Sequence, residues 1–271
     1  MRAIRYQEFF AQHPAFTYGE FERFCASQRN LSKRTQDSLL TYYTKTGRIL
    51  RVRRGLFASV PLGASSEASA VDPYLLAARL TDDAVLAYHT ALEFHGKAYS
   101  VQQQFLYLTK HAARPLRFRS HNFRAVRLPK ALKAKKRGSF GIVIADRLGL
   151  DVRVTSLERT LVDVLDRPDL GGGWEEIWRS LESVEFFDLD QVVKYALLLG
   201  NGTTIAKVGL YLEQHREALM VTDSHLKRLR AHRPAKAHYL DRTRRESGRF
   251  ISTWNLVVPQ TVLERSWQEV P

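Results

Sequence analysis

The amino-acid sequence predicts an α+β protein in which an N-terminal winged helix-turn-helix precedes a larger α+β domain built from a small sheet and packed helices. Within residues 1–60, two short helical segments separated by a polar turn lie ahead of two short strands, a pattern typical of a winged helix. Short apolar runs and then helical periodicity follow, which indicates the larger domain. We therefore expect a winged helix at 1–62, a linker at 63–71 and an α+β domain at 72–271.

The first predicted helix begins at a capping box. Thr17 is followed three residues later by Glu20, so each side chain can accept a hydrogen bond from the backbone amide of the other residue. Apolar residues then recur at helical spacing up to about residue 27: Phe21, Phe24 and Cys25. Because Cys25 is the only cysteine, it has no partner for an internal disulfide, and we expect it in the core.

The second predicted helix follows a polar turn at 28–30. Ser32 can cap a helix over 33–46, and Gly47 can end it in a left-handed conformation. On a helical wheel, one face holds the residues expected to pack: Thr35, Leu39, Tyr42 and Tyr43. The opposite face is basic and rich in hydroxyl groups: Lys33, Arg34, Asp37, Ser38, Thr41 and Lys45.

Two short predicted strands, at 49–53 and 56–60, are joined by Arg54 and Gly55. Apolar and arginine side chains alternate along the first of them: Leu50, Arg51, Val52 and Arg53. One face of this hairpin can therefore pack on the helices while the other presents guanidinium groups, as the wing of a winged helix does.

A winged helix of this composition predicts double-stranded DNA as its partner. The second helix can enter a major groove about 12 Å wide while arginines of the wing contact phosphates or the adjacent minor groove. The residues expected to read base edges are Ser32, Lys33, Arg34 and Gln36. The residues expected on the DNA backbone are Arg48, Arg51, Arg53 and Arg54. The alternative is a protein-docking winged helix, against which the arginine-rich wing argues.

The net charge of +14, from 42 Lys and Arg against 28 Asp and Glu, favours a polyanionic partner. The segments 110–137 and 227–249 are basic and poor in acids, whereas 151–223 is acidic. We expect a second basic surface that holds flanking phosphates, formed by Lys133, Lys135, Lys136, Arg137, Lys227, Arg228, Arg230, Arg244 and Arg245.

Hydropathy argues against a membrane partner. No apolar run approaches the roughly 18 residues that a membrane span needs, and the first ten positions carry charges where a signal peptide would be apolar. The sequence therefore predicts a cytoplasmic protein.

Beyond a linker-like segment at 61–70, Asp72 and Pro73 are typical of a helix cap and first turn. Five β-like runs follow, at 105–108, 116–119, 123–128, 142–145 and 152–154. Four helical stripes come next, at 157–165, 174–181, 192–197 and 208–212.

Three segments resemble the AbiEi family of antitoxins: YHTALEFHG (88–96), VTSLERTLVD (154–163) and LYLE (210–213). The resemblance extends from the winged helix to about residue 220, and the chain after about 225 has no counterpart in it. It implies a winged helix ahead of an antitoxin domain, and a repressor of its own operon that binds inverted repeats. It also implies a nucleotidyltransferase-like toxin as the genetic partner. Direct contact with that toxin through the C-terminal domain is the alternative route of neutralisation.

The polar residues of these segments have structural explanations. His89 and Glu93 share a helical face, but His95 lies well around it and no fourth ligand is near, so we expect structural histidines and no metal. Ser156 can cap a helix in which Arg159 and Asp163 have the spacing of an ion pair.

No catalytic motif is present. The glycines at 171–173 lead into Trp174 and lack the lysine and hydroxyl residue of a phosphate-binding loop. Asp188 and Asp190 stand where acids favour the start of a helix. We therefore expect neither a cofactor nor an enzyme, with modification of the toxin as the remaining enzymatic alternative.

Overall fold

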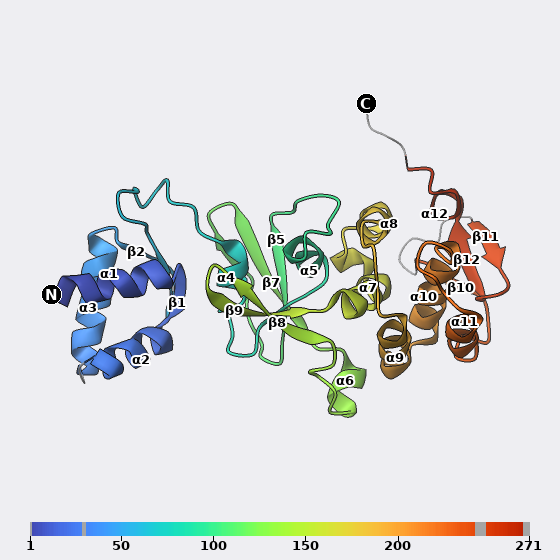
Figure 1. Cartoon of the computed structure of the whole chain (residues 1–271), viewed down its shortest axis with the longest axis horizontal. Coiled ribbons are helices and arrows are strands. Elements are labelled where there is room, and N and C mark those ends of the chain that lie inside the picture. Colours follow the sequence, from blue (N-terminus) through green and yellow to red (C-terminus); the bar gives the residue numbers. More distant parts are fainter. Residues whose placement is uncertain (1, 29–30, 242–247, 268–271) are drawn as a thin grey trace. The chain divides into compact units, whose positions relative to one another are not determined.

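The computed structural model describes residues 2–28, 31–241 and 248–267, with side chains from Tyr6 onward (Figure 1). The chain divides into two compact units. The first comprises Met1–Leu86, Gln103–Ala125 and Ile144–Arg153, and the second Ala87–Gln102, Val126–Val143 and Val154–Pro271. Both units contain helices and sheets, so the fold is α+β, as the sequence predicts. No helix in the described ranges is both long and apolar enough to cross a membrane.

The N-terminal part is a winged helix (Figure 1). Its elements in chain order are α1 (Arg2–Gln12), β1 (Ala15–Thr17), α2 (Tyr18–Gln28), α3 (Lys33–Lys45), β2 (Ile49–Arg53) and β3 (Leu56–Ser59). The sheet order is β1-β3-β2 with antiparallel pairing, and β2 and β3 form the wing hairpin. The predicted helices and strands of this part are confirmed, whereas α1 and β1 went unpredicted.

Local signals set these boundaries. Glu20 accepts hydrogen bonds from the backbone amide and the hydroxyl of Thr17 at 2.6 and 2.9 Å, and its own amide donates to the Thr17 hydroxyl at 3.2 Å, which completes the predicted capping box. Gly47, at φ 72°, ends α3 in the left-handed region that favours glycine.

An aromatic-rich core lies beneath α3 and the wing. Its buried residues are Phe9, Phe10, Phe16, Phe21, Cys25, Leu40, Ile49 and Phe57. The Phe16 and Phe57 rings stack at a centroid distance of 5.5 Å, which joins the sheet to its core. Cys25 is buried as predicted, and burial raises the pKa of its thiol to about 11.

A six-stranded sheet follows in the order β6-β7-β5-β4-β9-β8. Its strands are β4 (Val85–Leu86), β5 (Gln104–Thr109), β6 (Leu116–Phe118), β7 (His121–Arg127), β8 (Ile142–Arg147) and β9 (Leu150–Thr155). All five predicted β-like runs are confirmed as strands. Asp72 caps the short helix α4 (Pro73–Ala77), as expected from the sequence. The Arg119 guanidinium donates to the carbonyls of Ser66 and Ser69, so the linker-like segment is fastened to the sheet.

The second unit is mainly helical. Its helices are α5 (His89–Phe94), α6 (Lys130–Ala134), α7 (Leu157–Asp166), α8 (Trp174–Glu182), α9 (Leu189–Leu199), α10 (Gly202–Gln214), α11 (Asp223–Arg230) and α12 (Gln260–Glu264), with a 3-10 turn at Pro168–Leu170. A three-stranded sheet of β10 (His238–Tyr239), β12 (Leu256–Pro259) and β11 (Gly248–Ile251) forms from the C-terminal region. Trp254 of this region packs against Gly209 of α10, where an added methyl group would overlap the indole ring.

A buried ion pair anchors α7. Ser156 caps the helix, and the Arg159 Nε atom lies 3.1 Å from Asp163 Oδ2, as the i,i+4 spacing predicts. Both side chains are buried. The Tyr195 hydroxyl donates to Asp163 at 2.7 Å and Arg159 donates to the Phe140 carbonyl at 2.7 Å, so both charges have further partners. A role in the core therefore accounts for Arg159 and Asp163 of the VTSLERTLVD segment.

We expect Asp163→Ala to lower the free energy of unfolding by about 3–5 kcal/mol, because it leaves the Arg159 charge buried without its carboxylate. Glu175→Ala is the matched control. It breaks another Arg–carboxylate pair at i,i+4 spacing, with Arg179 at 3.0 Å, but one that water reaches. That change should cost less than about 1 kcal/mol. Urea unfolding of both variants makes the comparison, and equal losses would contradict the core role of the pair.

Candidate nucleic-acid interface

The start of α3 presents three of the four predicted base-contacting residues to solvent. Ser32 is the N-cap, and its hydroxyl oxygen accepts a hydrogen bond from the Thr35 amide at 3.2 Å. Lys33 and Arg34 follow immediately, and both are exposed. Lys33 and Arg34 therefore occupy the positions from which a DNA-recognition helix would reach base edges.

Gln36 is a correction to the sequence-based set. Its side chain is buried at 5% exposure, and its Nε2 donates to the Leu31 carbonyl at 3.0 Å. The packed face of α3 is centred on Gln36 and Leu40, and Leu39 and Tyr43 of the predicted stripe pack against the same core. Thr35 and Tyr42 of that stripe are exposed instead. Gln36 therefore does not offer its amide to a base in this structure.

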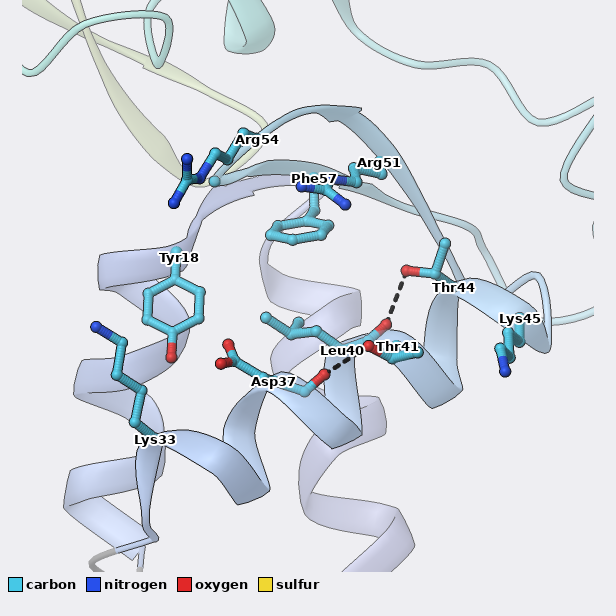
Figure 2. A pocket seen from close by; sticks show the side chains of 11 residues that line it. Tyr18, Lys33, Asp37, Leu40, Thr41, Thr44, Lys45, Arg51, Arg54 and Phe57 are labelled. Carbon is cyan, nitrogen blue, oxygen red and sulfur yellow. Dashed lines mark hydrogen bonds between the residues drawn. The ribbon is translucent and has the colours of Figure 1, made fainter.

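A groove runs between α3 and the wing, and we call it the wing groove (Figure 2). Its volume is about 570 Å³. It is lined by Tyr18, Lys33, Asp37, Leu40, Thr41, Thr44, Lys45, Arg51, Arg54, Gly55 and Phe57. Figure 2 shows the α3 side chains along one wall and the two arginines on the hairpin opposite. Residues far apart in the sequence thus bring cationic groups to both walls.

The two threonine hydroxyl groups of the wing groove already donate hydrogen bonds within α3. Thr41 donates to the Asp37 carbonyl at 2.8 Å, and Thr44 donates to the Leu40 carbonyl at 2.7 Å, as drawn in Figure 2. Their oxygens keep lone pairs that can still accept a hydrogen bond. The charged donors of the wing groove are therefore its lysines and arginines, which suit phosphate oxygens.

The four wing arginines have three different surroundings. Arg51 and Arg54 are exposed and line the wing groove. Arg48 is half-buried and lies outside the groove lining. The Arg53 guanidinium donates to the Leu80 carbonyl, so it ties the wing to the rest of the first unit. The ladder between β2 and β3 shifts register between Arg51 and Arg53, and such a bulge redirects side chains. Arg53 is exposed, but because the Leu80 carbonyl holds its guanidinium we expect no phosphate contact from it, unlike the sequence-based prediction.

The predicted second basic surface is partly used within the protein. Lys135 Nζ donates to the Leu198 carbonyl at 2.7 Å, where the positive charge suits the C-terminus of α9. Arg228 pairs with Asp190 at 2.6 Å, and Arg230 pairs with Glu213 at 2.9 Å. The exposed remainder is Lys133, Lys136, Arg137 and Lys227. Arg244 and Arg245 lie outside the described residues.

Many acids of the segment 151–223 also have internal partners. Glu176 lies 2.9 Å from His89 Nε2 and accepts from the Ser100 hydroxyl at 2.6 Å. Burial opposes its ionisation, but these hydrogen bonds outweigh burial and lower the pKa of Glu176 to about 2. Glu182 contacts His215 at 2.9 Å. Such pairing leaves less free negative charge for a basic partner than the composition indicates.

The two histidines of the YHTALEFHG segment have hydrogen-bond partners within the protein. His89 is buried against Glu176, and His95 Nε2 lies 2.8 Å from the Thr155 carbonyl oxygen. Among the described residues, ligand atoms close enough to hold a metal occur at Asp82, Asp83 and His111. The Asp83 carboxylate already accepts from the Lys110 amide at 2.7 Å and from Thr109. The sequence analysis did not identify this cluster, because the spacing of its three residues along the chain is not typical of a metal site.

Comparison with known proteins supports the fold. No protein-family model matches the chain, and no curated protein matches it. The structure is similar to the crystal structure of the RV2827C protein from Mycobacterium tuberculosis, with a TM-score of 0.62 and 18% sequence identity. The similarity covers 96% of this chain and 92% of that one, so the same α+β architecture extends over nearly the whole length.

We expect Arg51→Ala and Arg54→Ala each to weaken binding to double-stranded DNA of any sequence. Each should also reduce the slope of log affinity against log salt by about 0.9, because one phosphate contact is lost. Arg53→Ala is the matched control, since its guanidinium is bound to Leu80, and its slope should equal that of the wild type. Fluorescence anisotropy of a labelled duplex over a salt series measures all three. A slope lowered equally by the three changes would contradict the assignment.

Proposed function

We propose that the protein is a DNA-binding transcriptional regulator that recognises double-stranded operator DNA through its winged helix. The wing groove carries this proposal, because exposed basic residues of α3 and of the hairpin face it from two sides. In the proposed complex, Lys33 and Arg34 lie in the major groove while Arg51 and Arg54 hold the phosphate backbone beside it. The net charge of +14 adds a general attraction to DNA.

We further propose that the regulator is a cytoplasmic antitoxin that represses its own toxin-antitoxin operon by binding inverted repeats. This part rests on the resemblance of three segments to AbiEi antitoxins, whose genetic partner is a nucleotidyltransferase-like toxin. The segment residues described above, including His89, Arg159 and Asp163, are buried and stabilise the fold. They support a shared architecture, and we assign no catalytic role to them.

Direct contact with the toxin through the second unit is the second candidate function. Several large apolar side chains there are exposed to solvent: Tyr99 at 58%, Val101 at 92% and Phe186 at 68%. Exposed apolar side chains favour a protein partner where they gather in one patch. Co-purification with the product of the neighbouring gene tests this route. Transfer of label from a nucleotide to that product tests the enzymatic alternative.

The first experiment compares binding to the DNA upstream of the protein's own gene with binding to shuffled DNA of equal length, at two salt concentrations. We expect the wild type to prefer the upstream DNA, and Arg34→Ala to lose much of that preference, because an arginine–guanine contact is worth about 1–3 kcal/mol of discrimination. Circular dichroism verifies that the variant is folded. Equal binding to the two DNAs, or none, would contradict a sequence-specific regulator.

A further inference from the structure

The wing groove contains an acid among its bases. Of the charged residues in its described lining, Lys33, Lys45, Arg51 and Arg54 are basic and Asp37 is acidic. A carboxylate so placed repels the phosphates that the other four attract. Asp37 therefore weakens binding to DNA in general, and its presence requires a different explanation from that of its neighbours.

The structure does not neutralise the charge of Asp37. The residue is exposed, one turn after Lys33 on α3. Within the described part of the chain, no nitrogen of Lys, Arg or His lies within the 4.0 Å of an ion pair. In Figure 2 the Tyr18 hydroxyl faces the Asp37 carboxylate. Burial and then the charge of Asp37 raise the pKa of Tyr18, so the phenol stays protonated and can donate.

The chemistry of a carboxylate restricts what it can read in a major groove. An ionised carboxylate only accepts hydrogen bonds, so it needs a donor on the base edge. The donors there are the N4 amino group of cytosine and the N6 amino group of adenine. Adenine places its N7 acceptor beside N6, which repels a carboxylate, whereas cytosine has no acceptor beside N4 on that edge. A cytosine therefore suits Asp37 best.

We propose that Asp37 is a specificity-determining residue, whose carboxylate accepts a hydrogen bond from the N4 amino group of one cytosine in the operator. This inference rests on the proposed function and names one base pair that the winged helix reads. The guanine paired with that cytosine offers O6 and N7, which suit a basic residue of the preceding turn, Lys33 or Arg34. Asp37 thus lowers affinity for DNA in general and raises it for one base pair.

The test begins with duplexes selected by the wild-type protein from a library of random sequence. Affinities are then measured for the selected duplex and for all single-base changes within it. We expect one position at which the wild type prefers cytosine and at which Asp37→Ala lowers that preference about 5- to 150-fold, leaving only the part that the contact of Lys33 or Arg34 with the paired guanine supplies. We expect Asp37→Asn to prefer adenine there, because an amide both donates and accepts. Both variants should bind unselected DNA more tightly than the wild type does.

Two controls separate base reading from a general effect of charge. Glu8→Gln removes the charge of an exposed acid of α1 outside the groove lining, and it should retain the cytosine preference. Duplexes with N4-methylcytosine at the preferred position replace the amino hydrogen that faces the major groove and keep the base pair. The methyl group should weaken the wild type but leave Asp37→Ala nearly unaffected, which a double-mutant cycle measures as coupling.

The outcomes distinguish this inference from the proposed function. If the wild type selects a sequence but Asp37→Ala keeps the same cytosine preference, the role proposed for Asp37 is wrong, whereas the proposed function as a DNA-binding regulator is retained. If the wild type selects no sequence, both are overturned. We expect Asp37→Ala and Asp37→Asn to unfold at the same temperature as the wild type, because the position is exposed. Equal unfolding temperatures exclude loss of folding as the cause of a change in binding.

Discussion

The packing of α3 on the aromatic core decides what the winged helix can present. Leu40 is buried among the phenylalanines of α1, α2 and the small sheet, and the Phe10 and Tyr43 rings meet edge to face at 4.9 Å. This packing fixes the rotation of the helix about its axis. A rotation of α3 by one residue, about 100°, would bring the Gln36 amide to the surface and bury the Asp37 carboxylate in its place. The composition of the wing groove is thus a consequence of apolar contacts on the opposite side of α3.

Where local chemistry decides the structure, the sequence is sufficient. The capping box at Thr17, the cap at Ser32, the left-handed Gly47 and the hairpin turn at Gly55 each act over a few residues, and each predicted boundary lies within a few residues of the observed one. The strands and helices of the larger part follow from periodicity in the same way, because burial of one face requires it.

The rest depends on contacts that sequence patterns do not carry. The helix α1 has charged residues among its apolar ones, and only its position against α2 shows that Phe9 and Phe10 belong to the core. Gln36 is polar yet buried, because its amide finds the Leu31 carbonyl. Arg53 alternates with apolar residues as a wing residue should, but its partner Leu80 is 27 positions away. Composition counts charges and cannot show which of them are already paired.

The close approach of Trp254 to Gly209 makes the C-terminal sheet part of the helical unit. The indole is fully buried against α10, and its Nε1 donates to Glu213 at 2.7 Å. Because α10 ends at Gln214, residue 220 looks like a suitable place to shorten the chain. A chain cut at that point would keep α10 but expose the surface that receives the indole, and it would leave Glu213 without that donor. Fragments meant to isolate an active portion of the second unit should therefore extend through β12. In shorter fragments, any loss of activity could come from the exposed surface of α10.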